Sequence, residues 1–194
     1  MKNKIEENIE ILLNLQRSYF KNSSVVKNIE DVTNLVVKIF KSKKKIFICG
    51  NGGSMCDAMH FAEEFTGRFN YDRAPLPVIS ISDPSHLSCT TNDYGYKNVF
   101  SRYIQAFGRK GDAIFLLSTS GNSPNIISAY HKAKELEISS IALLGKDGGK
   151  LKGECDYEFF VPSFLTERVQ EIHMSLLHLI IRFTEETLFP NHYK

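Results

Sequence analysis

The stretch "KIFICGNGGSMCDAMHFAEEF", residues 45–65, joins a short apolar run to a glycine-rich turn and then to a helical pattern. The run is apolar from Ile46 to Cys49 without alternation, which is typical of a strand buried on both faces. Beyond the turn, apolar residues recur at helical spacing at Met55, Ala58, Met59, Ala62 and Phe65. A buried strand, a tight turn and an amphipathic helix in this order form the repeating unit of parallel α/β sheets.

The same alternation extends over the rest of the chain. β-rich runs occur at residues 76–82, 113–121, 140–145 and 157–163, and helical segments occur at residues 54–68, 84–107, 123–136 and 166–188. We therefore predict an α/β fold with a five-stranded parallel sheet that is covered by helices on both faces. In such folds, ligands bind at the carboxyl ends of the strands, beside the helix N-termini.

Two amphipathic helices are predicted before the first strand, over residues 5–20 and 26–40. Their apolar stripes must be buried, and we expect a second copy of the chain to cover them. We find no linker or internal repeat. One domain is therefore expected over residues 1–194, in which residues 1–42 contribute to an oligomer and residues 43–194 form the α/β core.

The composition is that of a soluble globular domain. The chain has 194 residues, of which 42% are hydrophobic and 24% charged, with a net charge of +2. So small a charge gives no reason to expect nucleic acid or membrane as a partner, and no apolar stretch approaches the ~20 residues of a membrane span. The four cysteines lack C-x-x-C spacing, and the N-terminus does not resemble a signal peptide. We expect reduced thiols and a cytoplasmic location.

The turn "GNGGS" at residues 50–54 is a candidate anion site that includes Asn51, Gly52 and Gly53. Glycines let backbone N–H groups converge, and the helix N-terminus adds partial positive charge. The spacing of Ser54 and Asp57 predicts a capping box. A plain tight turn explains the glycines equally well. Dinucleotide binding is disfavoured because Met55 occupies the third glycine position of G-x-G-x-x-G, and a Walker A loop is excluded because no Gly-Lys-Ser/Thr follows.

A second polar loop, "LLSTSGNSPN", follows the third strand. Ser123 is a natural N-cap and Pro124 a natural first helical residue, but one hydroxyl suffices for capping. The loop offers four hydroxyls, those of Ser118, Thr119, Ser120 and Ser123. Hydroxyls and backbone amides together can bind a phosphate monoester without a lysine or a magnesium ion, so we favour a phosphate site here.

Asn92 and Asp93 precede Gly95 in the segment "NDYGY". We interpret this segment as a turn. Its polar side chains would suit hydrogen bonds to sugar hydroxyls, although the same residues occur in routine turns.

His60 and Glu64 are four residues apart on the predicted helix that follows the glycine turn. At this spacing their Cβ atoms lie ~6 Å apart on one helix face. Such a pair can share a divalent metal or act as a base and its partner. A charged stripe alone is more often a solvated face, but the phosphate-like turn on the same helix favours a functional site.

The last helix is apolar nearly all round, and His178 lies within its most apolar part. A buried histidine needs a partner, which a packing role in the core could also provide. Gln170 lies eight residues earlier, ~12 Å along a helix axis. A site that includes both residues would be shared between subunits or would have Gln170 ahead of the helix. His173 is interpreted as a packing or surface histidine.

Six motifs, taken together, resemble one known family: "CGNGGS", "DAMHFAEEFTGR", "NDYGY", "STSGNSPN", "GKDGGK" and "RVQEIHMSLLH". They are similar to those of the sedoheptulose 7-phosphate isomerases, or phosphoheptose isomerases, of the SIS domain family. The resemblance runs in register over residues 45–178. It implies a flavodoxin-like SIS domain, a homotetramer with sites at subunit interfaces, and conversion of sedoheptulose 7-phosphate to D-glycero-D-manno-heptose 7-phosphate, the first step toward nucleotide-activated heptose for lipopolysaccharide and other glycans.

The resemblance also implies roles for individual residues. It places the ligands of one Zn²⁺ per subunit on His60, Glu64, Gln170 and His178, and the acid–base pair on Glu64 and His178. It places substrate contacts on Asn51, Gly52, Gly53, Glu64, Asn92, Asp93, Ser118, Thr119, Ser120, Ser123 and Gln170. Glu64 would be both a zinc ligand and the base, and a carboxylate bound tightly to zinc is a poorer base. We therefore expect that bound substrate loosens the bond between Glu64 and the zinc ion.

Two further expectations follow. The first is geometric: His178 of one copy is expected to reach Glu64 of another copy. The second concerns the alternative function, that of a non-catalytic SIS-domain protein that binds the bacterial replication initiator. The end of this chain, "ETLFPNHYK", resembles the end of that relative. That relative lacks the active-site glutamate and final histidine. Because Glu64 and His178 are present here, the sequence favours the enzyme.

Overall fold

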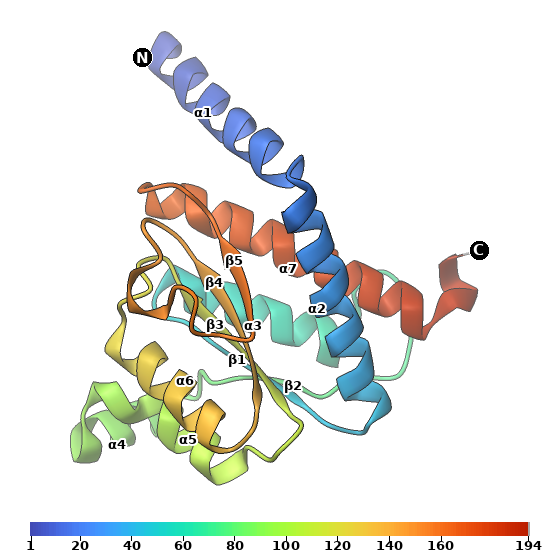
Figure 1. Ribbon diagram of the computed structural model, residues 1–194, viewed down its shortest axis with the longest axis vertical. Coiled ribbons are helices and arrows are strands. Elements are labelled where there is room, and N and C mark those ends of the chain that lie inside the picture. The colour runs from blue at the N-terminus through green and yellow to red at the C-terminus, as the bar shows by residue number, and fades with distance from the viewer. Residues whose placement is uncertain (194) are drawn as a thin grey trace.

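The computed structural model describes residues 1–193 and forms an α/β fold (Figure 1). Its strands are β1 (Ile46–Cys49), β2 (Val78–Ser80), β3 (Ala113–Ser118), β4 (Ser139–Leu144) and β5 (Tyr157–Phe160). Its α-helices are α1 (Lys2–Phe20), α2 (Ser23–Lys41), α3 (Gly53–Thr66), α4 (Pro84–Tyr94), α5 (Val99–Phe107), α6 (Pro124–Glu135) and α7 (Thr166–Leu188). Short 3-10 turns lie at Tyr96–Asn98, Gly149–Leu151 and Pro190–Tyr193.

The five strands form one parallel sheet in the order β2-β1-β3-β4-β5, which confirms the predicted sheet. This is the flavodoxin-like order, in which the chain reverses its direction across the sheet between β1 and β3. Ile46 pairs with Ala113 and Cys49 with Leu116, so β1 and β3 end close to each other. The loops that follow these two strands therefore flank the switch point, where ligands bind in folds of this kind.

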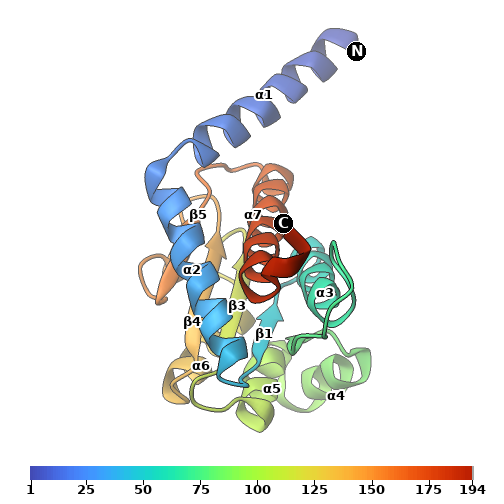
Figure 2. The ribbon, with the colours of Figure 1, turned by 90° about the vertical axis from the view of Figure 1, so that its right-hand side faces the viewer.

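Successive side chains along each strand point to opposite faces of the sheet and pack in two hydrophobic cores, one on each face. Ile48 and Phe115 pack in a core with helices α2, α3 and α7, whereas Phe47 and Leu116 pack in a second core with α5 and α6. Burial on both faces explains why the strands are continuously apolar in sequence. The two helical layers can be followed in Figures 1 and 2.

The two N-terminal helices differ in their burial. Val32 and Val36 of α2 are fully buried against the sheet, so α2 completes a helical layer. Helix α1 instead projects away from the body in both views (Figures 1 and 2). Its apolar residues Ile5, Ile9 and Leu13 are about half exposed, at 53%, 48% and 43%. Within residues 1–193, no helix has the length and apolarity needed to cross a membrane.

His173 of α7 is a packing histidine, as its sequence context suggested. It is fully buried, and its Nε2 lies 3.1 Å from the carbonyl oxygen of Leu144 at the end of β4. Burial lowers the pKa of His173 from 6.5 to about 4, opposed in part by the hydrogen bond to Leu144. The folded chain therefore holds this imidazole neutral at pH values where the unfolded chain protonates it.

We expect this histidine to make the free energy of unfolding depend on pH. Because the folded-state pKa is the lower one, stability is complete above pH 6.5 and falls by about 3 kcal/mol as the pH decreases to 4. The variant His173→Gln has no titratable group and should lose this part of the pH dependence. Urea unfolding of both proteins at pH 7.0 and 4.5 measures the difference, and equal pH dependence in both would contradict the assignment.

Candidate functional site

The glycine turn lies at the carboxyl end of β1, as predicted, and leads directly into α3. Gly52 is the N-cap of α3 and has φ +56°, a conformation that favours glycine. A Cβ on Gly53 would lie 2.6 Å from Nε2 of Gln170, so this glycine permits close approach of α7. The predicted capping box is wrong: α3 has no side-chain cap, because the helix begins at Gly53 and Ser54 is already inside it.

The second polar loop follows β3 and is tied to the first loop by side-chain amides. Asn51 and Asn125 exchange two hydrogen bonds, of 3.0 and 2.8 Å, across the two loops. The hydroxyl of Tyr96 donates a third, 2.8 Å bond to Oδ1 of Asn51. The structure thus brings the N-termini of α3 and α6 to one edge of the sheet, where both helix dipoles favour an anion.

Ser123 is the N-cap of α6 and Pro124 is its first residue, both as predicted. The Ser123 side chain nevertheless makes no capping hydrogen bond. Its hydroxyl accepts a 3.3 Å hydrogen bond from the hydroxyl of Ser118, which lies at the end of β3. The Ser118 and Ser123 hydroxyls are therefore bonded to each other and not to the helix start, and the Ser120 hydroxyl accepts a 3.2 Å hydrogen bond from the backbone N–H of Asn122. Thr119 and Ser120 are part of the same loop and are half-buried.

Asn92 and Asp93 lie in the last turn of α4, which Gly95 ends with φ +79°. The prediction of a turn at these two residues is wrong, because the helix continues to Tyr94 before the glycine breaks it. Both side chains are exposed, and Asn92 donates a 2.7 Å hydrogen bond to Asp93. Neither side chain forms a hydrogen bond with the loops described above.

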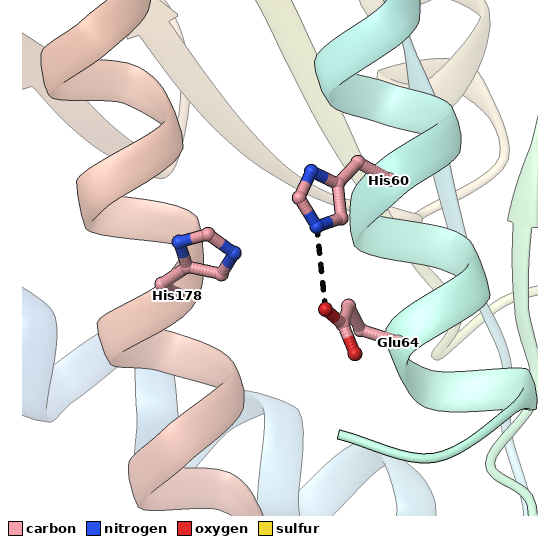
Figure 3. Close-up of side chains that lie close together, drawn as sticks. All are labelled: His60, Glu64 and His178. Atoms are coloured by element: carbon pink, nitrogen blue, oxygen red, sulfur yellow. Dashed lines mark hydrogen bonds and ion pairs between the residues drawn. The ribbon is translucent and has the colours of Figure 1, made fainter. Parts of the chain in front are cut away.

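Three side chains converge between α3 and α7: His60, Glu64 and His178 (Figure 3). One potential ligand atom from each lies within 4.8 Å of those of the other two. His60 Nε2 lies 3.2 Å from Glu64 Oε1, as their four-residue spacing predicted. The rings of His60 and His178 meet edge to face, with centroids 5.0 Å apart.

The convergence of these side chains occurs within one chain. The expectation that His178 reaches Glu64 from a second copy is therefore wrong. Gly53 meets Gln170, and further along both helices His60 and Glu64 meet His178. Helices α3 and α7 thus run side by side in the same direction. The helix face that carries His60 and Glu64 therefore lies against the part of α7 that carries His178.

Gln170 lies inside α7, four residues after its start at Thr166, and not ahead of the helix. Its Nε2 donates a 3.3 Å hydrogen bond to the Ser54 hydroxyl at the glycine turn. Eight helical residues separate Gln170 from His178, about 12 Å along the axis. Within one chain, Gln170 therefore belongs with the loops and not with the three converging side chains.

The surroundings of His178 shift its pKa downward. Burial lowers the pKa of His178, and the nearby His60 lowers it further, while Glu64 opposes both effects. A neutral imidazole can coordinate a metal or exchange protons. One turn before His60, burial raises the pKa of Asp57 to about 6, and its Oδ2 is buried without a hydrogen-bond partner among the described residues.

Several contacts around the site could not be read from the sequence. Phe69 stacks on the His178 ring, with centroids 6.0 Å apart and planes at 24°. Tyr96 and Asn125 hold the side chain of Asn51. Asn125 is the second residue of α6 and ends the quoted sequence segment "LLSTSGNSPN", which is a weak signal of its role. Tyr96 ends the quoted segment "NDYGY" and carries an equally weak signal, whereas Phe69 carries none, because its contact depends on how distant segments pack.

Comparison with known proteins gives the chain its family. The model of the SIS domain family matches residues 16–145. A phosphoheptose isomerase from Fusobacterium nucleatum is 53% identical over 179 residues, which is 92% of this chain and 92% of that protein. The chain belongs to the phosphoheptose isomerases of the SIS domain family.

Two more members of this family cover nearly the whole chain. A phosphoheptose isomerase from Vibrio vulnificus is 47% identical over 189 residues, 97% of each chain. The solved structure of phosphoheptose isomerase GmhA from Neisseria gonorrhoeae has a TM-score of 0.89 and 34% identity, and covers 95% of this chain and 98% of its own. The family resemblance stated from the motifs is thus confirmed, and so is the SIS fold.

Proposed function

We propose that this chain is an aldose–ketose isomerase that converts sedoheptulose 7-phosphate to D-glycero-D-manno-heptose 7-phosphate. The observation that carries the proposal is the cluster of His60, Glu64 and His178, which unites a carboxylate base, an imidazole with a lowered pKa and three potential metal ligands. Two polar loops at helix N-termini offer amides and hydroxyls for the phosphate. The relatives named phosphoheptose isomerase support the same reaction.

In the proposed reaction, Glu64 removes a proton from carbon 1 of the ketose, and His178 donates a proton to the carbonyl oxygen on carbon 2. The result is a cis-enediol. His178 then takes the proton from the oxygen on carbon 1, while Glu64 returns its proton to carbon 2. The carbonyl group thereby moves to carbon 1, and every proton that was removed has been returned.

The donor set of the cluster fits a catalytic zinc site. Two imidazoles and one carboxylate are common ligands of catalytic zinc, which can expand its coordination from four to five ligands. His60, Glu64 and His178 would hold the ion, and we propose that Gln170 of a second copy completes the set. A zinc ion bound there would supply Lewis-acid polarisation of the sugar carbonyl.

The loops are proposed to bind the rest of the substrate. Asn51, Gly52 and Gly53, together with Ser118, Thr119, Ser120 and Ser123, would contact the phosphate and sugar. Asn92 and Asp93 would contact sugar hydroxyls. In one chain, Gly53 and Glu64 are eleven helical residues apart, about 16 Å. This separation is the reason to propose a site that uses loops and cluster from different copies.

We propose that the chain forms a homotetramer in the cytoplasm. The half-exposed apolar residues Ile5, Ile9 and Leu13 on the projecting helix α1 support an interface between copies. Cys49, Cys56, Cys89 and Cys155 are free thiols, as in proteins of a reducing compartment. The product would serve the synthesis of nucleotide-activated heptose for lipopolysaccharide or other surface glycans.

The proposed function is tested with the purified full-length chain and sedoheptulose 7-phosphate. Formation of the aldoheptose, followed by NMR with and without a chelator, is the expected result. Fructose 6-phosphate in a parallel reaction tests whether the site accepts any phosphoketose. A chain that leaves sedoheptulose 7-phosphate unchanged with added Zn²⁺ would contradict the proposal and favour the alternative, a non-catalytic protein that binds the replication initiator.

The Ser123 hydroxyl gives a sharper test of the phosphate loop. Ser123→Ala should raise the KM for sedoheptulose 7-phosphate about tenfold, since a hydrogen bond to a charged group contributes about 1.5–3 kcal/mol. Folding stability should change little, because Ser123 makes no capping bond and the variant loses only the long 3.3 Å hydrogen bond from Ser118.

The matched control is Asn22→Ala. Asn22 caps α2 through a 2.9 Å bond from the backbone N–H of Ser24. Its loss should lower the free energy of unfolding by about 1 kcal/mol and leave the KM unchanged. If Ser123→Ala destabilised the chain as Asn22→Ala does while its KM stayed at the wild-type value, the loop assignment would be wrong.

A further inference from the structure

A buried ion pair joins the ends of the two helices that carry the site. Arg73 lies in the coil between α3 and β2, and its Nε donates a 2.9 Å hydrogen bond to Oε1 of Glu185 on α7. The two side chains are 0% and 1% exposed. Charges buried to this degree are tolerated only where other hydrogen bonds satisfy their remaining donors and acceptors.

The rest of the Arg73 guanidinium caps the end of α3. Its Nη2 donates a 2.6 Å bond to the carbonyl oxygen of Glu64, and its Nη1 donates a 2.7 Å bond to that of Phe65. Carbonyls in the last turn of a helix have no partner within the helix, and α3 has no basic residue of its own in that turn. One of the two capped carbonyls belongs to Glu64, the proposed base.

The Glu185 carboxylate accepts hydrogen bonds from three residues. Besides Arg73, it accepts a 2.6 Å hydrogen bond from the Tyr193 hydroxyl and a 3.4 Å bond from the backbone N–H of Asn70. Glu185 follows His178 by seven residues, which is two turns of α7 and about 10 Å along the same helix face. The ion pair therefore links the residue that supplies the base to the helix that supplies the imidazole.

From these contacts we infer that Arg73 and Glu185 are positioning residues for the site. They hold α3 and α7 at the axial register at which His178 meets His60 and Glu64. Apolar side chains between two helices tolerate small shifts along the axis, whereas a forked guanidinium bonded to one helix end and to a carboxylate of the other does not. The inference rests on the proposed function for the chemistry that this register serves.

The test compares variants that keep or remove parts of this linkage. Glu185→Gln keeps the shape of the side chain but removes its charge, and Arg73→Lys keeps the charge but cannot bond both helices at once. The matched control is Asp112→Asn at a second ion pair, in which Lys45 lies 2.8 Å from a carboxylate that is 1% exposed. That pair joins the amino-terminal ends of β1 and β3, at the opposite edge of the sheet from the loops.

Two measurements report on the geometry of the site and not only on whether the variant folds. One is Co²⁺ binding to the metal-free protein, measured by titration and by the visible absorption spectrum of the bound ion. The other is the separation of kcat from KM for sedoheptulose 7-phosphate. We expect Glu185→Gln and Arg73→Lys to weaken Co²⁺ binding about tenfold, alter its spectrum and lower kcat about tenfold, with KM within about twofold of wild type. Asp112→Asn should lower the unfolding midpoint and leave the Co²⁺ affinity, the spectrum and kcat unchanged.

A double variant keeps the test decisive if a single change prevents folding. Arg73→Met with Glu185→Leu removes both buried charges, a replacement that folded proteins often accept. It should fold and show the same losses in Co²⁺ affinity and kcat. Folded variants with wild-type Co²⁺ affinity, spectrum and kcat would overturn the inference. A wild-type chain that binds Co²⁺ but does not convert sedoheptulose 7-phosphate would refute the proposed function instead, and the cobalt comparison would still decide this inference.

Discussion

Replacing Glu64 by glutamine is expected to lower kcat for sedoheptulose 7-phosphate about a thousandfold. The amide has nearly the same shape but cannot accept a proton from carbon, and a positioned base contributes about 10²–10⁴-fold to the rate. Substrate binding should persist, because the polar loops that are proposed to contact the phosphate are unchanged. The measurement is a steady-state assay of the full-length variant, with binding of sedoheptulose 7-phosphate followed by calorimetry.

The neighbouring Glu63 offers a matched control for this variant. Its carboxylate lies 3.9 Å from His60 Nε2, but the side chain is 63% exposed and is not part of the three-residue cluster. Glu63→Gln should therefore retain kcat within about twofold of wild type. If Glu64→Gln bound metal and substrate normally and also kept full turnover, Glu64 would not be the base.

Removal of the metal is expected to lower turnover about a hundredfold, and one equivalent of Zn²⁺ per chain should restore it. Dialysis against a chelator, followed by titration with Zn²⁺, measures both changes. The affinity should fall as the pH decreases, because protons compete for the imidazoles. Since burial lowers the pKa of His178, protonation of His178 should contribute to this fall at a lower pH than that of an ordinary histidine.

Two histidine variants separate the site from metal binding elsewhere on the chain. His60→Asn should bind Zn²⁺ at least about a hundredfold more weakly than wild type, because it removes one of three converging ligands. His131 on α6 is exposed and outside the cluster, so His131→Asn should leave the affinity unchanged. Equal affinities for His60→Asn and wild type would show that the metal binds at another place.

The fold was largely predictable from the sequence because buried parallel strands are continuously apolar. The runs that contain Ile46, Ala113 and Ser140 became β1, β3 and β4, and the helices between them cover the sheet as expected. The start of α6 was also predictable, since the Ser123-Pro124 pair has strong helix-start preferences. The start of α3 was less predictable, because Gly52 with its positive φ is the N-cap and the helix begins at Gly53, one residue before Ser54.

The site was predictable where it depends on local spacing and not where it depends on packing. His60 and Glu64 meet because residues four apart share a helix face. The contact of Glu64 with His178 joins residues 114 positions apart (178 − 64) and depends on the register of α3 against α7. No periodicity encodes that register, which led to the wrong expectation that a second copy supplies His178.

We propose that Glu64 performs the isomerisation together with His60 and His178 of the same chain. The most direct test is to run the reaction of sedoheptulose 7-phosphate in D₂O and to follow the aldoheptose by NMR. The wild-type chain should form product with deuterium at carbon 2, because Glu64 exchanges the proton that it carries with solvent, and Glu64→Gln should form almost none. No aldoheptose from the wild-type chain, or equal product and equal deuterium from Glu64→Gln, would contradict the claim.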